Sequence, residues 1–219
     1  MLYMMKTIRN TITASLLLLC IPMLAFSAEG IIEYVNGDVS LERGGRRIAA
    51  DFGLAVDGGD VVVTGADGVA VVRLNDRTQV KLRENTRVQI DSVSEQAAVT
   101  LGSGGLFARV ARHTTASARN VAGFEVRTPT VVAGVRGTEF FVAYGRTIED
   151  SPDLWLCVNE GTVEVAIPDT GEATLVEEGE GINILGGRRS TQPRRYPWTR
   201  DLNWNFDPAT GDIADSTDL

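Results

Sequence analysis

The stretch from Phe124 to Val142 constrains the fold more than any other, because two apolar runs are joined there through the pentapeptide 134–138. In its first part, apolar and polar residues alternate, which is the pattern of a strand with one buried face. Pro129 then has no backbone N–H to donate, so this strand should end or bend before the next apolar run begins. The stretch therefore predicts short strands of an all-β fold.

The pentapeptide itself should form a tight corner between buried strands. Gly134 and Gly137 flank Arg136, and glycine accepts positive φ or a close approach of another backbone. We expect Gly137 to adopt a positive φ. We expect Arg136 to be at least partly buried, with its guanidinium bonded to backbone carbonyls or to a carboxylate, because a buried unpaired charge is costly.

Similar strand and turn signals recur from residue 30 to residue 185. Asn36-Gly37 is typical of a two-residue hairpin turn. The segment Thr78–Leu82 is repeated in type by Thr86–Ile90, so Thr, Val and Leu or Ile should point inward while Gln, Lys and Arg point outward. This weak self-similarity fits a β-helix or β-roll, and it fits a β-sandwich almost as well.

Several short motifs occur in a fixed order along this β region. They are Leu54 with Gly59-Asp60-Val61, Thr64-Gly65, Val69–Leu74, Thr128-Pro129, Val135-Arg136-Gly137-Thr138, Phe140–Val142 and Glu160-Gly161-Thr162-Val163. The set resembles the FecR family over residues 54–166. The resemblance implies a short-stranded, β-helix-like or β-roll-like domain and favours it over the sandwich.

The resemblance also implies which residues form the family signature. They are Thr128, Pro129, Gly134, Arg136, Gly137 and Thr138, and their expected role is structural. The family offers no catalytic residue to transfer, so we expect no enzyme activity.

The first 27 residues read as a secretory signal peptide. Lys6 and Arg9 precede an uncharged apolar run, and Ala25 and Ser27 are small residues at the positions that cleavage after Ser27 requires. We therefore expect a helical signal peptide at 1–27, an all-β domain at 28–185 and a C-terminal tail at 186–219. The mature chain should be periplasmic or secreted, without a transmembrane span.

Charge and residue content exclude several classes of function. The formal net charge is −8, and −10 once the signal peptide leaves, which argues against a nucleic-acid partner. The chain has one histidine, and Cys157 is the only cysteine after the signal peptide, so the ligands for a metal site are lacking. Cys157 lies in an apolar run and should be a small buried hydrophobe. We expect no cofactor.

The tail changes in character after residue 185. It contains four arginines and two aromatic residues close together, namely Arg188, Arg189, Arg194, Arg195, Tyr196 and Trp198, and an acidic end follows them. One interpretation is a tail whose aromatic side chains pack on the domain and leave the arginines in water. The other is a binding site for an anionic partner, in which the arginines pair with carboxylate or phosphate.

These observations favour a non-catalytic, exported FecR-type module that binds an envelope protein or an anionic polymer in envelope sensing or assembly. The alternative is a structural or secreted surface protein that self-associates or packs into a larger envelope assembly.

Overall fold

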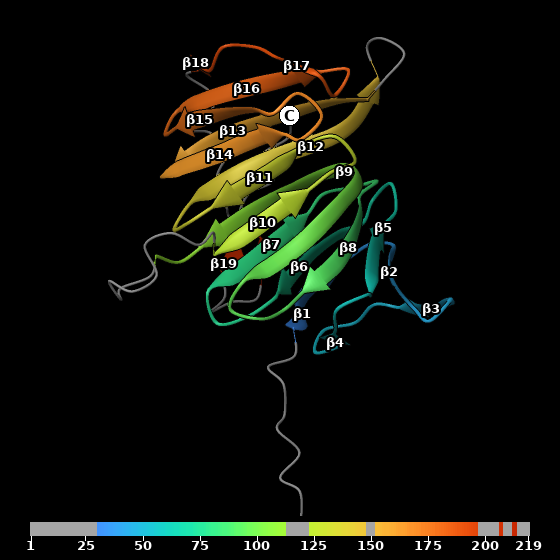
Figure 1. Cartoon of the computed structure of the whole chain (residues 1–219). Coiled ribbons are helices and arrows are strands. Elements are labelled where there is room, and N and C mark those ends of the chain that lie inside the picture. Colours follow the sequence, from blue (N-terminus) through green and yellow to red (C-terminus); the bar gives the residue numbers. More distant parts are fainter. Residues whose placement is uncertain (1–29, 113–122, 148–151, 197–205, 208–211, 214–219) are drawn as a thin grey trace, which may run out of the picture.

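The computed structural model describes residues 30–112, 123–147, 152–196, 206–207 and 212–213, and these residues form an all-β fold without a helix (Figure 1). The expectation of an all-β domain is therefore confirmed. The predicted signal peptide and Trp198 lie outside the described residues.

Within these ranges the structure offers no helix that is long and apolar enough to cross a membrane.

The strands form two layers, which we call sheet A and sheet B. In sheet A the strand order is β4, β1, β6, β7, β9, β12, β13 and β16, with β17 and β18 both paired to the outer side of β16. The bounds are β1 (Gly30–Asn36), β4 (Ala55–Val56), β6 (Val69–Arg73), β7 (Thr78–Leu82), β9 (Ala97–Val110), β12 (Glu139–Thr147), β13 (Pro152–Glu160), β16 (Glu180–Leu185), β17 (Arg189–Ser190) and β18 (Arg194–Arg195).

In sheet B the order is β3, β2, β5, β8, β9, β10, β11, β14 and β15. The bounds are β2 (Val39–Arg43), β3 (Arg46–Ala49), β5 (Val61–Thr64), β8 (Arg87–Ser92), β10 (Phe124–Arg127), β11 (Val132–Val135), β14 (Thr162–Ile167) and β15 (Glu172–Glu177). The pairing of β9 with β10 is parallel, and the other pairings in both sheets are antiparallel. A separate pair joins β19 (Phe206–Asp207) to β20 (Asp212–Ile213).

Strand β9 belongs to both sheets. Its first half pairs with β8 in sheet B, and its second half pairs with β7 and β12 in sheet A. The change of sheet occurs at Gly104, whose φ is 91° and where an added Cβ would lie only 2.5 Å from the Thr86 Cα. Glycine is required at this position because any side chain would collide with the neighbouring turn.

One hydrophobic core fills the space between the two sheets. Fully buried side chains from sheet A, such as Val72 and Val80, belong to the same cluster as Leu41 and Val88 from sheet B. Along the chain, strands and strand pairs alternate between the sheets, so the backbone winds around one elongated core (Figure 1). The fold thus combines the winding of the predicted β-roll with the facing layers of the β-sandwich.

The turn at Asn36-Gly37 differs from its prediction. It does not close a hairpin, because β1 pairs in sheet A while β2 pairs in sheet B. Gly37 does adopt a positive φ of 70°, and an added Cβ would lie 2.1 Å from the Asp67 carbonyl oxygen. The dipeptide favours a sharp reversal of the chain. Its backbone preference does not determine whether the two flanking strands pair with each other.

The predicted inward faces of Thr78–Leu82 and Thr86–Ile90 are confirmed, because Thr78, Val80, Leu82, Thr86, Val88 and Ile90 are all buried. Lys81 is the exception among the residues predicted to point outward. It lies on the outer face of sheet A but is only 6% exposed. The side chain therefore points outward as predicted, but the sequence pattern did not predict its burial there.

Cross-strand neighbours explain the burial of Lys81. On the outer face of sheet A, directly paired residues form a row across five strands: Val71, Lys81, Phe107, Phe141 and Cys157. The ammonium nitrogen lies 4.6 Å from the centroid of the Phe107 ring, a cation–π distance. Alternation in one strand identifies the face, whereas burial on that face depends on the neighbouring strands.

Burial lowers the pKa of Lys81 to about 8. Between about pH 8 and pH 10.5 the unfolded chain therefore binds more protons at this site than the folded chain. Over this range we expect the wild type to gain stability relative to Lys81→Met, by on the order of 3 kcal/mol. Below pH 8 the lysine is protonated in both states, so the difference should be constant. Urea unfolding of both proteins at a series of pH values measures the difference in their free energies of unfolding. A difference that does not change with pH would contradict the lowered pKa of Lys81.

Candidate functional site

The signature residues Thr128 and Pro129 form the turn of the hairpin between β10 and β11. The Thr128 N–H donates to the Val131 carbonyl oxygen at 2.8 Å, and the Val131 N–H donates to the Thr128 hydroxyl oxygen at 3.0 Å. The threonine side chain thus closes the turn, and the strand ends at the proline as predicted. An added Cβ on Gly187 would lie 2.5 Å from the Thr130 Cγ2, so the chain after β16 passes directly against this turn.

The predicted corner lies between β11 in sheet B and β12 in sheet A. Gly134 pairs within sheet B, and Gly137 has the expected positive φ of 65°. An added Cβ on Gly137 would lie 2.2 Å from the Arg112 Cγ. Thr138 is buried, and its hydroxyl donates to the Thr162 carbonyl oxygen at 3.1 Å. These contacts hold the chain where it changes sheets.

Arg136 is partly buried, as expected. No hydrogen bond or ion pair joins its guanidinium to another described residue, so the expected bonding to carbonyls or to a carboxylate is wrong within the described part of the chain. Near the same corner, the exposed Arg112 instead pairs with Glu160 at 3.1 Å. The signature as a whole positions strands, and its contacts are internal.

A second internal contact was missed by sequence reasoning. Asp60, from the Gly-Asp motif, is only 3% exposed and receives two hydrogen bonds from Arg43, at 2.8 Å from Nε and 2.5 Å from Nη2. Burial alone would raise the pKa of Asp60, but the Arg43 guanidinium and the Asp57 N–H outweigh it and hold the pKa below its ordinary value. The motif predicted a loop, whereas the arginine lies 17 residues away in the sequence.

The arginines of the tail lie at one edge of sheet A. Leu185 pairs with Arg189 in β17, and Gly181 pairs with Arg194 in β18. The β-sheet therefore continues beyond the expected domain boundary at residue 185. The Tyr196 ring lies close to Gly181, where an added Cβ would be 3.2 Å from its Cδ2.

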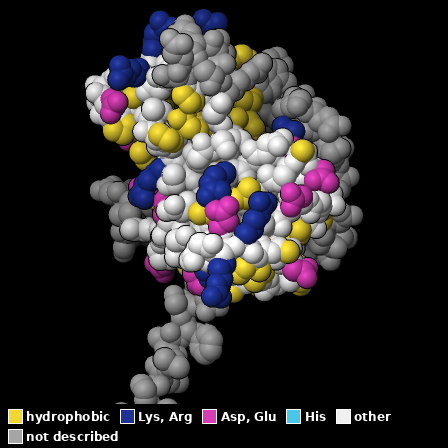
Figure 2. Space-filling model, turned by 90° about the vertical axis from the view of Figure 1, so that its right-hand side faces the viewer, with side chains coloured by type: hydrophobic (Ala, Val, Ile, Leu, Met, Phe, Trp, Pro, Cys, Tyr) yellow, Lys and Arg dark blue, Asp and Glu magenta, His cyan; other side chains and the backbone are white. Residues whose placement is uncertain are grey.

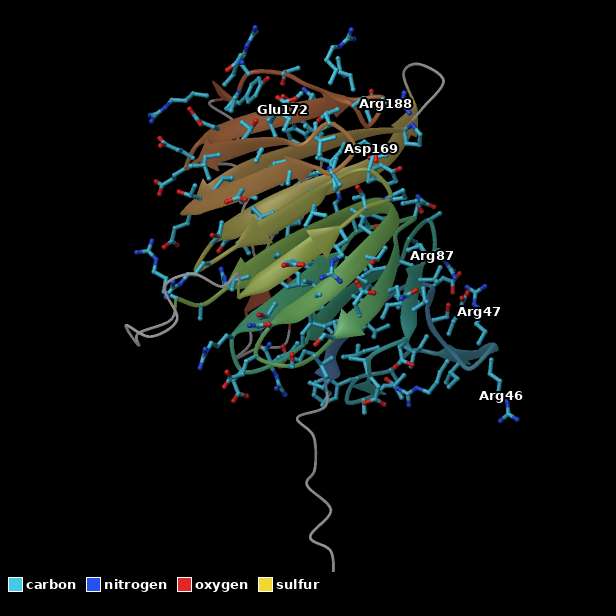
Figure 3. The ribbon with its side chains drawn as sticks, viewed as in Figure 1. Arg46, Arg47, Arg87, Asp169, Glu172 and Arg188 are labelled. Atoms are coloured by element: carbon cyan, nitrogen blue, oxygen red, sulfur yellow. The ribbon has the colours of Figure 1, made fainter. Side chains whose placement is uncertain are left out.

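The four guanidinium groups face solvent. Arg188, Arg189, Arg194 and Arg195 are all exposed, and none of them forms an ion pair with another residue in the described ranges. Figure 2 shows Lys and Arg side chains gathered at the upper end of the molecule, and Figure 3 places Arg188 at that end, near Asp169 and Glu172. We call the four residues the arginine edge. They are distributed along the same outer edge of sheet A, with Arg189 opposite Leu185 and Arg194 opposite Gly181, while Trp198 lies outside the described residues.

Two further candidate sites are a reactive cysteine and a metal centre. Cys157 is fully buried, as predicted, and burial raises the pKa of its thiol to about 12, so the reactive thiolate is disfavoured. Among the described residues, no group of three or more His, Cys, Asp or Glu side chains is placed to hold a metal ion.

The chain is similar to solved structures and to one family model. Two crystal structures from Parabacteroides distasonis, both of proteins provisionally described as anti-sigma factors, share 22% and 23% sequence identity with it, at TM-scores of 0.49 and 0.47. The matches cover 62% and 61% of this chain, and the chain spans only 59% and 57% of those proteins. A search among curated proteins finds no match.

The family comparison agrees with the motifs. The family model described as "FecR protein" matches residues 60–164, a range that contains Asp60, the hairpin turn at Thr128 and the corner at Gly137. The chain therefore carries a domain of the FecR family.

Proposed function

We propose that the chain is a non-catalytic, exported interaction module of the cell envelope, acting in envelope sensing or assembly, and that its arginine edge binds an acidic protein. The FecR domain supports the envelope assignment, because such domains are usually periplasmic parts of envelope signalling proteins. The signature residues support a scaffold role, since their contacts hold strands together.

The observation that carries the proposal is the arginine edge itself. Three of the exposed arginines lie on two short strands, and Arg188 lies in the turn just before β17. No described strand pairs with the outer side of β17 or β18. An unpaired strand edge offers backbone groups to an added strand, and guanidinium groups bind carboxylates with two parallel hydrogen bonds. An acidic, extended segment of a partner protein fits both features.

The test compares two pairs of arginines. The change Arg194→Gln with Arg195→Gln removes two charges from the arginine edge, and Arg46→Gln with Arg47→Gln removes two exposed charges at the far end of the molecule (Figure 3). We expect the mature wild-type chain to capture a partner from envelope extract, with capture weakened by salt and by the first pair of changes alone.

Three outcomes would count against this function. Equal capture by both variants would show that the arginine edge is not the binding site. Capture that survives protease treatment of the extract would identify a polymer in place of a protein. Concentration-dependent self-association in light scattering, without other capture, would favour the structural alternative, to which the exposed Phe52 and Leu175 would contribute.

A further inference from the structure

A cavity of about 620 Å³ lies beside the point where β9 passes from sheet B to sheet A. Its lining includes Asn85, Tyr144, Asp153, Trp155 and Asn183. The volume is in the range of sites that bind small molecules. The cavity shares none of these residues with the arginine edge or with the family signature, so a role for it is separate from the function proposed above.

The backbone around this cavity is irregular at three adjoining places. Gly104 and Gly145, which both line it, have φ values of 91° and 106°, and the register of β12 against β13 shifts at Gly145. Asn85 has a φ of 53° and is the one described residue other than glycine with a positive φ. Bulges and left-handed residues gather at binding sites, where they direct side chains that a regular strand would place elsewhere.

Asp153 gives the cavity its chemical character. The side chain is largely buried, and its Oδ1 accepts a hydrogen bond from the Gly186 N–H at 2.7 Å. The other oxygen, Oδ2, is buried and has no hydrogen-bond partner among the described residues. A buried carboxylate oxygen that lacks a donor is costly. A ligand with a positively charged donor would supply what is missing.

The other lining residues restrict the ligand further. Trp155 provides an aromatic ring, which attracts cations over its face, and Asn85 and Asn183 provide amides that both donate and accept hydrogen bonds. The Tyr144 side chain belongs to the core between the sheets. We propose that this cavity binds a small polar molecule that carries a primary ammonium group and hydroxyl groups, as an amino sugar does. The ammonium group pairs with Asp153, and the amides hold the hydroxyl groups.

Two probes of nearly the same shape test the charge requirement. D-glucosamine carries the ammonium group, and N-acetyl-D-glucosamine presents the same ring with a neutral amide. In calorimetric titrations of the wild-type chain slightly below neutral pH, we expect D-glucosamine to bind and the acetylated sugar to bind at least about tenfold more weakly, because hydrogen bonds to charged groups are the stronger ones. Equal binding of the two, or no binding of D-glucosamine, would overturn the proposal.

Matched variants locate the site. Asp153→Asn retains an oxygen that accepts from Gly186 and removes the charge, so affinity for D-glucosamine should fall by about tenfold or more. Asp169→Asn, an exposed carboxylate in the turn after β14 (Figure 3), should bind like the wild type. Unchanged affinity in Asp153→Asn would refute the assignment. If that variant does not fold, NMR shifts of the wild type on adding D-glucosamine decide, and shifts away from Asn85 and Asn183 would refute it.

Discussion

Gly137→Val is expected to destabilise the domain by about 3 kcal/mol or more, because two separate costs add at this position. Gly137 has a φ of 65°, a region that β-branched residues rarely adopt. A Cβ there would also lie 2.2 Å from the Arg112 Cγ and 3.0 Å from its Cα. Arg112 lies two residues beyond the end of β9, and its side chain pairs with Glu160 at 3.1 Å, so making room for the added Cβ would disturb this pair. Thermal unfolding and urea unfolding of the variant measure the loss.

Gly171→Val is the matched control. Gly171 has a similar φ of 70°, but an added Cβ would have no atom within 4 Å. This variant therefore carries the backbone cost alone, about 1–2 kcal/mol. The difference between the two variants isolates the crowding at the corner. Equal losses would show that the corner has room for a side chain and that only its dihedral angle requires glycine.

The corner at Gly137 and the end of the strand before Pro129 were predictable because both depend on local chemistry. Proline removes a donor, threonine closes a turn, and glycine permits positive φ wherever these residues occur. The sequence pattern also identified the buried face of β7 and β8. Each of these inferences needs only residues that are close together in the chain.

Features that depend on partner strands could not be predicted. Asn36-Gly37 has the chemistry of a hairpin turn, yet its flanking strands enter different sheets. Lys81 is buried because Phe107 lies opposite it, and the pairing joins strands that are far apart in sequence. The cavity near Asp153 is likewise formed by segments whose proximity only the fold reveals.

The burial of Asp60 also depends on a residue that is distant in the sequence, Arg43. Breaking this ion pair should cause the second large loss of stability. In Arg43→Met the carboxylate of Asp60 stays buried but loses two hydrogen bonds and its countercharge. Removing one partner of a buried pair is strongly destabilising. Since the Arg43 side chain is 40% exposed, we expect a loss near the lower limit for such pairs, about 3 kcal/mol at pH 7.

A second charged pair provides the control. Arg87 also donates two hydrogen bonds to a carboxylate, that of Glu42, at 3.0 and 2.7 Å. In that pair the Glu42 side chain is 33% exposed, against 4% for the Asp60 side chain, so Arg87→Met (Figure 3) should change stability little. A loss as large as that of Arg43→Met would mean that the burial of Asp60 is not the cause.

The pH dependence of Arg43→Met distinguishes a lost charge pair from lost packing. In the wild type the pKa of Asp60 is lowered, so its contribution is present above the ordinary carboxyl pKa of about 3.9 and is lost as the pH falls through the folded value. In the variant, burial without the arginine should raise this pKa, so protonation relieves the buried charge. The loss caused by Arg43→Met should therefore shrink in acid, between about pH 5 and pH 3. A loss that stays constant over this range would assign the effect to the methylene groups of Arg43.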